Sequence, residues 1–214
     1  MNVIEALQIS PLGMTIRLIR SRFLSLSWAV SGRPMPMPPH KKVRAIEDAA
    51  IHIHATVFIE TGTYRGDTSK ILSKRVHQVV SVEIDKRLAA LARERFSNSN
   101  VEILEGDSAE LMNSIVSRFK NQVCLYWLDG HYSAGVTGGG IKPVPVQREL
   151  EEILPFLKSS DLIIIDDIRE FDGKNYPSLE SLTSYITQIR PDLGYRALND
   201  MLFIGAPISG LFDF

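Results

Sequence analysis

The stretch FIETGTYRGDTSKIL, residues 58–72, combines one acid and two glycines in a spacing that suits ligand binding. An apolar run ends at Glu60, and Gly62 and Gly66 follow before helical periodicity begins. Glycines at such a turn let another group approach the backbone closely. An acid there would repel phosphate, so this turn differs from the G-x-G-x-x-G turn that presents a helix N-terminus to a pyrophosphate. It suits a ligand with an ammonium or sulfonium group.

Acidic residues also follow four later runs of apolar and β-branched residues. The runs that read as strands lie at 55–60, 78–83, 101–104, 122–128 and 161–166, with helical periodicity between them. The acids at or after their ends are, in order, Glu60, Glu83, Asp107, Asp129 and the pair Asp166 and Asp167. Ligands of parallel α/β sheets bind at the carboxyl ends of the strands. A single acid could be solvated surface, whereas five strand ends in register indicate a ligand site.

The alternation of strands and helices predicts the fold class. The strands are apolar on both faces, which is typical of a parallel sheet covered on both sides. We therefore expect an α/β, doubly wound, mostly parallel Rossmann-like sheet of seven strands. The stretch GYRALNDMLFIGAP reads as two strands around Asn199 and Asp200, an antiparallel hairpin at the sheet edge. We expect an N-terminal helix and proline-rich connector over 1–42 and the Rossmann-like domain over 43–214.

Composition narrows the class of protein. The chain has 214 residues, of which 44% are hydrophobic and 23% charged, as in globular proteins. Its net charge of −1 gives no overall basic field, so we expect no nucleic-acid partner. The lone cysteine, Cys124, excludes an internal disulfide and should pack as a small hydrophobe. A reducing, cytoplasmic location follows as the expectation.

The N-terminal segment reads as an amphipathic helix. It starts at Ser10 and Pro11 and stops at Gly32. Its apolar face comprises Ile16, Ile19, Phe23, Leu26 and Val30, while Trp28 lies off that face. Arginines at 17, 20 and 22 interrupt any run long enough to span a membrane. The helix could cover the domain, pair with a second copy as a homo-oligomer, or make peripheral membrane contact, and the sequence leaves these alternatives open.

The second and third strand ends complete a candidate ligand. Glu83, about 20 residues after the first turn, is placed to accept both hydroxyls of a ribose. Asp107 and Ser108, after the third strand, could read the edge of an adenine. An adenosine that carries positive charge and no phosphate describes S-adenosylmethionine.

These stretches resemble the motifs of class I S-adenosylmethionine-dependent methyltransferases. FIETGTYRG is similar to the first motif, VVSVEID to the second and LEGDS to the third, and the resemblance covers 55–206. It implies that the cofactor is S-adenosylmethionine, with Glu83 at the ribose. It also implies cofactor contacts from Glu60, Thr61, Gly62, Tyr64, Gly66, Asp107, Ser108 and Asp129. Another nucleotide-binding Rossmann protein is the alternative.

The last two strand ends indicate a metal site. Asp129, Asp166 and Asp167 would converge, and three anions without a cation raise one another's pKa values and cost stability. Oxygen ligands suit Mg²⁺. The LDG and IDD strand ends resemble those of the metal-dependent, macrocin-type sugar O-methyltransferases. That resemblance implies Mg²⁺ on the three aspartates and catalytic roles for Asp129 and His131, the latter as general base. The alternatives are a structural aspartate pair and an ordinary loop histidine.

The predicted function is a Mg²⁺-assisted O-methylation. The acceptor would be a hydroxyl of a sugar or small metabolite, so the expected partner is a small molecule or glycan. The chain departs from that family at LPFLKSSD and over 132–145, both on the acceptor side. A hydroxylase-like enzyme of the same fold, and a non-catalytic module that binds the cofactor or a partner, are the alternatives.

Overall fold

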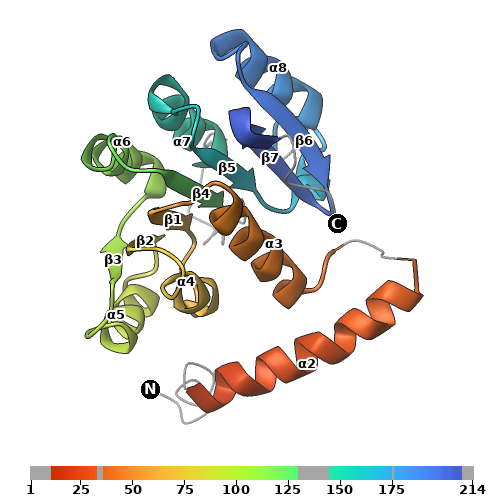
Figure 1. Cartoon of the computed structure of the whole chain (residues 1–214), viewed down its shortest axis with the longest axis vertical. Helices are drawn as coiled ribbons and strands as arrows, with labels where there is room; N and C mark the ends of the chain where they lie inside the picture. The colour runs from red at the N-terminus through yellow and green to blue at the C-terminus, as the bar shows by residue number, and fades with distance from the viewer. Residues whose placement is uncertain (1–10, 33–35, 130–144, 175, 209–214) are drawn as a thin grey trace.

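A seven-stranded sheet forms the centre of the computed structural model, which describes residues 11–32, 36–129, 145–174 and 176–208 (Figure 1). The strand order is β3-β2-β1-β4-β5-β7-β6. Five strands are parallel: β1 (Val57–Thr61), β2 (Gln78–Glu83), β3 (Val101–Glu105), β4 (Cys124–Leu128) and β5 (Leu162–Ile165). The hairpin of β6 (Gly194–Leu198) and β7 (Met201–Gly205) is antiparallel, with β7 beside β5 and β6 at the edge. The predicted fold class is confirmed.

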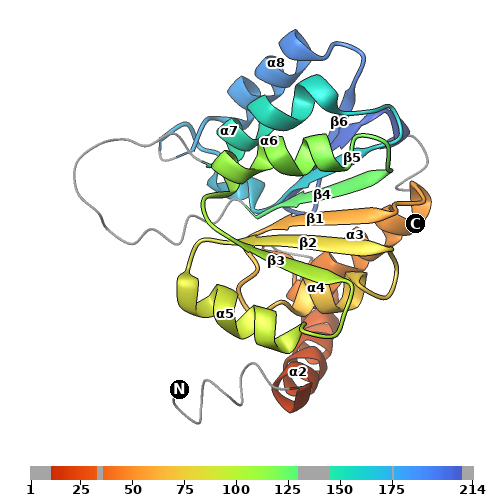
Figure 2. The same ribbon diagram turned by 90° about the vertical axis from the view of Figure 1, so that its left-hand side faces the viewer.

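Helices cover both faces of the sheet (Figure 2). One face carries α6 (Ser108–Arg118), α7 (Pro145–Ile153) and α8 (Leu179–Ile189), and the other carries α3 (Pro39–His52), α4 (Asp67–Leu72) and α5 (Lys86–Arg95). Short 3-10 helices follow at η1 (Leu154–Phe156), η2 (Ile168–Glu170) and η3 (Ala206–Ile208). Successive strand residues point to opposite faces. Ile59 therefore packs under α6 and α7, while Phe58 packs under α3.

Helix α3 is the main element that the sequence analysis did not predict. It begins at Pro39, inside the stretch we expected to be a proline-rich connector. Proline suits the first helical position because its missing N–H needs no partner there. Ile46, Ala49, Ala50 and Ile53 then repeat at 3-1-3 spacing and are buried against the sheet. The burial of this apolar stripe fixes α3 on the sheet.

The N-terminal helix α2 (Pro11–Val30) forms as predicted, but part of the predicted apolar face is not covered. Ile16, Ile19 and Val30, on the predicted apolar face, are exposed. Trp28 packs against the core instead, and α2 lies against α3. The predicted face is wrong in these positions because the place of α2 beside α3 decides which side chains are covered. None of the helices among the described residues has the length and apolar character to cross a membrane.

Cys124 packs in the core as predicted. It is fully buried in β4 and forms no disulfide. Burial raises the pKa of its thiol to about 12, so the thiolate is disfavoured.

Gly66, just before α4, is approached closely by the protein itself. Its φ of +68° lies in the left-handed region that favours glycine. A Cβ at this position would lie 2.7 Å from Cε2 of Phe96, a buried side chain just after α5. The sequence indicated a close approach here, and the approaching group is this ring.

The first prediction concerns this contact. Gly66→Ala should lower the free energy of unfolding by about 2–4 kcal/mol, because a left-handed alanine and an overpacked ring both cost stability. Gly173→Ala is the matched control, since its φ is +81° but its nearest neighbour would lie at 3.5 Å. We expect the control to lose about 1 kcal/mol in urea unfolding. Equal losses of unfolding free energy in Gly66→Ala and Gly173→Ala would contradict the role of Phe96. Adding Phe96→Leu to the Gly66→Ala variant should recover part of its loss.

Candidate functional site

Glu60, the last residue but one of β1, is a buried carboxyl held by two serines. Its Oε2 accepts hydrogen bonds from the hydroxyl of Ser69 and, at 2.7 Å, from that of Ser81, its neighbour on β2. Burial raises the pKa of Glu60 to about 7; the two serines oppose this rise, and the nearby Asp129 adds to it. A cation placed beside Glu60 would therefore favour its ionised form.

The turn after β1 brings Asp129 to the same place. Gly62 has a φ of +84°, and a Cβ there would lie 3.4 Å from Cβ of Asp129. The left-handed φ favours glycine at 62, and the short distance shows that the end of β4 lies beside the first turn. The hydroxyl of Thr61 is buried beside Glu149 and makes no hydrogen bond of good geometry within the described part of the chain.

Glu83, at the end of β2, is held by backbone donors. Its Oε2 accepts from N–H of Tyr64 at 2.7 Å and its Oε1 from N–H of Asp85 at 3.0 Å. Tyr64 adopts a left-handed φ of +48° and leaves its ring more than half exposed. Among the described residues each of these oxygens accepts one such bond, and a carboxylate oxygen has two lone pairs. These two bonds fix the orientation of the Glu83 carboxylate, and its contact with a ribose stays a prediction.

The residues predicted to read an adenine are engaged with α7. Asp107 caps α6 through Ala109 N–H, and its Oδ2 lies 3.2 Å from Nη1 of Arg148. The hydroxyl of Ser108 donates to Oε1 of Glu149. The adenine contacts remain predictions.

Glu149 is a site residue that the sequence analysis missed. It lies in the apolar stripe of α7 with Val146, Leu150 and Ile153, and only 2% of it is exposed. An acid inside an apolar stripe was the available signal. Burial raises the pKa of Glu149 to about 7; Ser108 opposes this rise, and Asp107 and Asp129 add to it. The site therefore contains a second buried carboxyl that titrates near neutral pH.

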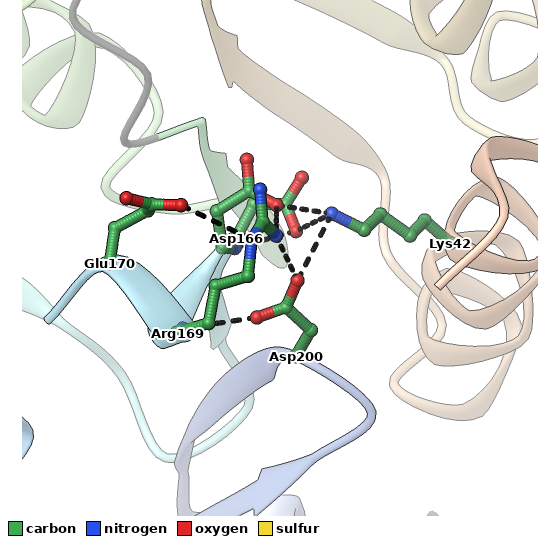
Figure 3. Close-up of polar contacts among 6 residues, drawn as sticks. Lys42, Asp166, Arg169, Glu170 and Asp200 are labelled. Carbon is green, nitrogen blue, oxygen red and sulfur yellow. Dashed lines mark hydrogen bonds and ion pairs between the residues drawn. The ribbon is translucent and has the colours of Figure 1, made fainter. Parts of the chain in front are cut away.

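The three aspartates of the last two strand ends converge as predicted. Each of Asp129, Asp166 and Asp167 offers one oxygen, and these oxygens lie within 4.8 Å of one another. Two of the three are already paired with a cation. Nζ of Lys42, from α3, lies 2.6 Å from Oδ1 of Asp166 and 2.5 Å from Oδ1 of Asp167 (Figure 3).

A second cation completes this cluster. Nη1 of Arg169 lies 2.5 Å from Oδ1 of Asp167 and also pairs with Asp200, which comes from the β6–β7 turn (Figure 3). Asp200 in turn accepts from the N–H of Arg169 at 3.0 Å. Sequence reasoning missed Lys42 and Asp200, because no local pattern links them to β5.

The cluster as arranged does not fit a magnesium ion. Mg²⁺ needs carboxylate oxygens free for coordination at about 2.0–2.1 Å. The Lys42 ammonium engages the Oδ1 atoms of Asp166 and Asp167 at hydrogen-bond distance. The predicted Mg²⁺ is not confirmed. His131 lies outside the described residues, and its role as a base stays a prediction.

Burial is the largest influence on the pKa of Asp166. It raises the pKa of this carboxyl to about 7; Lys42 opposes the rise, and Asp167 and Asp129 add to it. On the Lys42 side, burial alone would lower the pKa of the ammonium, but the charges of Asp166 and Asp167 raise it above the ordinary value. The ammonium stays charged, and it only partly offsets the burial of its acids.

Solved structures that share this fold include proteins named as methyltransferases. Cofactor-bound Rv0187 from MTB aligns with a TM-score of 0.56 and 15% identity over 96% of each chain. The SAH-bound Podospora anserina methyltransferase PaMTH1 aligns at 0.52 and 12% identity, over 92% of this chain and 88% of that one. MycE from the mycinamycin biosynthetic pathway, solved with Mg, SAH and mycinamycin VI, aligns at 0.51 and 14%, over 81% and 50%. The chain has the class I S-adenosylmethionine-dependent methyltransferase fold.

Sequence comparison gives a more particular likeness. A family model described as ribosomal RNA adenine dimethylase matches residues 42–122, less than half of the chain. "Probable ribosomal RNA small subunit methyltransferase A" from Pyrococcus abyssi is 33% identical over 84 residues, 37% of this chain and 31% of that protein. The Mycoplasma capricolum protein named ribosomal RNA small subunit methyltransferase A is 33% identical over 64 residues, 29% and 24%. The chain thus spans less than a third of these relatives.

These matches support the S-adenosylmethionine cofactor and correct the predicted acceptor. The prediction of O-methylation on a sugar or small metabolite, with a small-molecule or glycan partner and no nucleic acid, is wrong, because the relatives are named for ribosomal RNA. Net charge misled that prediction, since it sums the chain and ignores where charges are paired. The strand-end acids misled it too, because Lys42 and Arg169 already neutralise Asp166 and Asp167. The resemblance to the macrocin-type branch is not confirmed.

The second prediction concerns Glu149. Its pKa rises from about 4.5 to about 7 on folding, so the folded chain keeps a proton that the unfolded chain releases. The stability linked to this proton is present below about pH 4.5 and is lost as the pH rises through about 7. The loss should be about 1–3 kcal/mol.

Glu149→Gln should remove this dependence because glutamine is neutral and keeps the acceptor for Ser108. Relative to the native chain, the variant should gain stability between about pH 5 and about pH 8 in urea unfolding. Glu151→Gln, at an exposed position of the same helix, is the control and should follow the native chain. A difference between native chain and Glu149→Gln that does not change with pH would refute the assignment.

Proposed function

We propose that this chain is an S-adenosylmethionine-dependent methyltransferase that acts on RNA, with an adenine base as the acceptor. The proposal has two parts, a donor site at the ends of β1, β2 and β3 and an acceptor site at the ends of β4 and β5. Different observations support the two parts, so they are tested separately.

The observation that carries the donor part is the fixed carboxylate of Glu83. Two backbone N–H groups orient it at the end of β2, where nucleotide folds place the acid that binds the ribose. It lies within residues 42–122, the segment that matches the family model. Glu60 lies near the end of the adjacent strand, β1. The turn after β1 lacks the glycine pattern that binds a pyrophosphate, which suits a sulfonium nucleoside without phosphates. We assign the methionine end to the first turn and the adenine to Asp107 and Ser108.

The acceptor part rests on the sequence relatives and on charge pairing. The relatives carry the name of ribosomal RNA methyltransferases. RNA brings a phosphate backbone, which unpaired carboxylates would repel. Lys42 and Arg169 pair with Asp166 and Asp167. The edge of the sheet at the ends of β4 and β5 therefore carries less negative charge than the acids in the sequence suggest.

The proposed chemistry is a single displacement. The exocyclic nitrogen of adenine attacks the sulfonium methyl carbon as the carbon–sulfur bond breaks, and the sulfur leaves as a neutral thioether. The nitrogen then loses a proton to solvent. We assign Asp129 as hydrogen-bond acceptor for the amino group, because it lies beside Gly62 at the first turn. Positioning of this kind supplies much of the catalysis in a bimolecular transfer.

The third prediction tests the donor part. S-adenosylhomocysteine should bind in calorimetry, and Glu83→Gln should weaken it by about 10–100-fold, since the amide offers one acceptor in place of two. Glu105→Gln is the control, because Glu105 ends the neighbouring strand β3 but is exposed and pairs with Arg93. Absence of binding at millimolar ligand would overturn the donor part.

The fourth prediction tests the acceptor part. Radiolabelled methyl groups from S-adenosylmethionine should enter ribosomal RNA, and digestion should recover them on adenosine as one or two methyl groups by mass spectrometry. Asp129→Asn should lower the rate of methyl transfer to adenosine. RNA binding should weaken as salt rises, because phosphate contacts release counterions. Cofactor binding without any methylated RNA would reject the RNA acceptor and leave the donor part standing.

A further inference from the structure

Lys42 reaches the acid cluster because α3 is fixed by its apolar stripe. The stripe begins at Ile46, one turn after Lys42, and is buried against the sheet. This packing points the first turn of α3 at the end of β5. Only 12% of the Lys42 side chain is exposed, whereas Lys41, next to it, is exposed.

The ammonium lies among carboxylates from two different connections. It contacts Asp166 at 2.6 Å and Asp167 at 2.5 Å, and Asp200 lies 3.9 Å away (Figure 3). An ammonium has three donors, and two of them are used on the two Oδ1 atoms. The N–H of Asp167 also donates to Oδ1 of Asp166 at 2.7 Å, so this oxygen is held from two sides.

The place of Lys42 is unfavourable without these acids. A cation in the first turn of a helix opposes the helix dipole, and burial of an ammonium adds a desolvation cost. The acids Asp166, Asp167 and Asp200 are also buried, so their negative charges carry a desolvation cost unless a cation lies nearby. Arg169 supplies one cation for this group and Lys42 supplies the other. Each side of the arrangement therefore requires the other.

We propose that the Lys42 ammonium is the resident cation of the Asp129, Asp166 and Asp167 cluster and takes the position that a divalent metal ion would otherwise hold. Lys42 is a positioning residue: it fixes the two β5-end carboxylates beside Asp129 and couples the N-terminus of α3 to the mouth of the site. The proposal goes beyond the proposed function and does not depend on the methyl acceptor.

The fifth prediction tests this by metal binding, which needs no methyl transfer. The native chain should show no saturable Mn²⁺ or Mg²⁺ binding at this cluster in calorimetry and Mn²⁺ electron paramagnetic resonance. Lys42→Met removes the charge and leaves three carboxylates within reach of one ion, so Mn²⁺ affinity should rise at least about tenfold. Lys41→Met, at the exposed neighbouring position, should behave as the native chain.

Two further variants separate a resident cation from a merely structural ion pair. Lys42→Arg keeps the positive charge and should bind no Mn²⁺, whereas Lys42→Met with Asp166→Asn should lose the Mn²⁺ that Lys42→Met gains. Failure of Lys42→Met to gain Mn²⁺ would overturn the proposal. If Lys42→Met does not fold, the native chain decides: Mn²⁺ binding that Asp129→Asn removes would overturn the proposal, and its absence, with no Mg²⁺-specific shift in Tm, supports it.

Discussion

Buried negative charge at the carboxyl edge of the sheet is the constraint on which the rest of this structure depends. Parallel strands bring their ends to one edge, and here the strand ends carry Glu60, Glu83, Asp129 and the Asp166–Asp167 pair. Burial of a carboxylate is costly unless hydrogen bonds or cations compensate. The elements around the edge give Glu60, Glu83, Asp166 and Asp167 such partners.

The groups that stabilise the buried acids differ along the edge of the sheet, and this difference divides the site into two parts. On the β2 side, neutral donors serve: serine hydroxyls hold Glu60 and backbone N–H groups hold Glu83. On the β5 side, full charges serve, with Lys42 and Arg169 on the aspartate pair. Neutral donors leave the acids able to meet a cationic ligand, whereas ion pairs use up their charge. This contrast fits a sulfonium donor at one part and a neutral base at the other.

The likeness to known proteins follows the same division. The segment that matches the ribosomal RNA adenine dimethylase family, 42–122, contains β1, β2 and β3 and ends before β4. The elements past it, α7, β5 and the β6–β7 hairpin, contribute Glu149, Asp166 and Asp200. Lys42, the first residue of the matched segment, reaches across to this second part. The first turn of α3 thus joins the two parts.

The sequence by itself determined the sheet, the order of its acids and the convergence of Asp129 with Asp166 and Asp167, because apolar periodicity and strand ends are local properties. Only the tertiary structure decided which groups those acids contact. Lys42 is 124 residues from Asp166, and Asp200 is 31 residues from Arg169. Such pairs depend on how α3 and the β6–β7 turn pack on the sheet. A carboxylate looks the same in sequence whether an ammonium, a serine or a metal ion stabilises it, so the fold was predictable and its counterions were not.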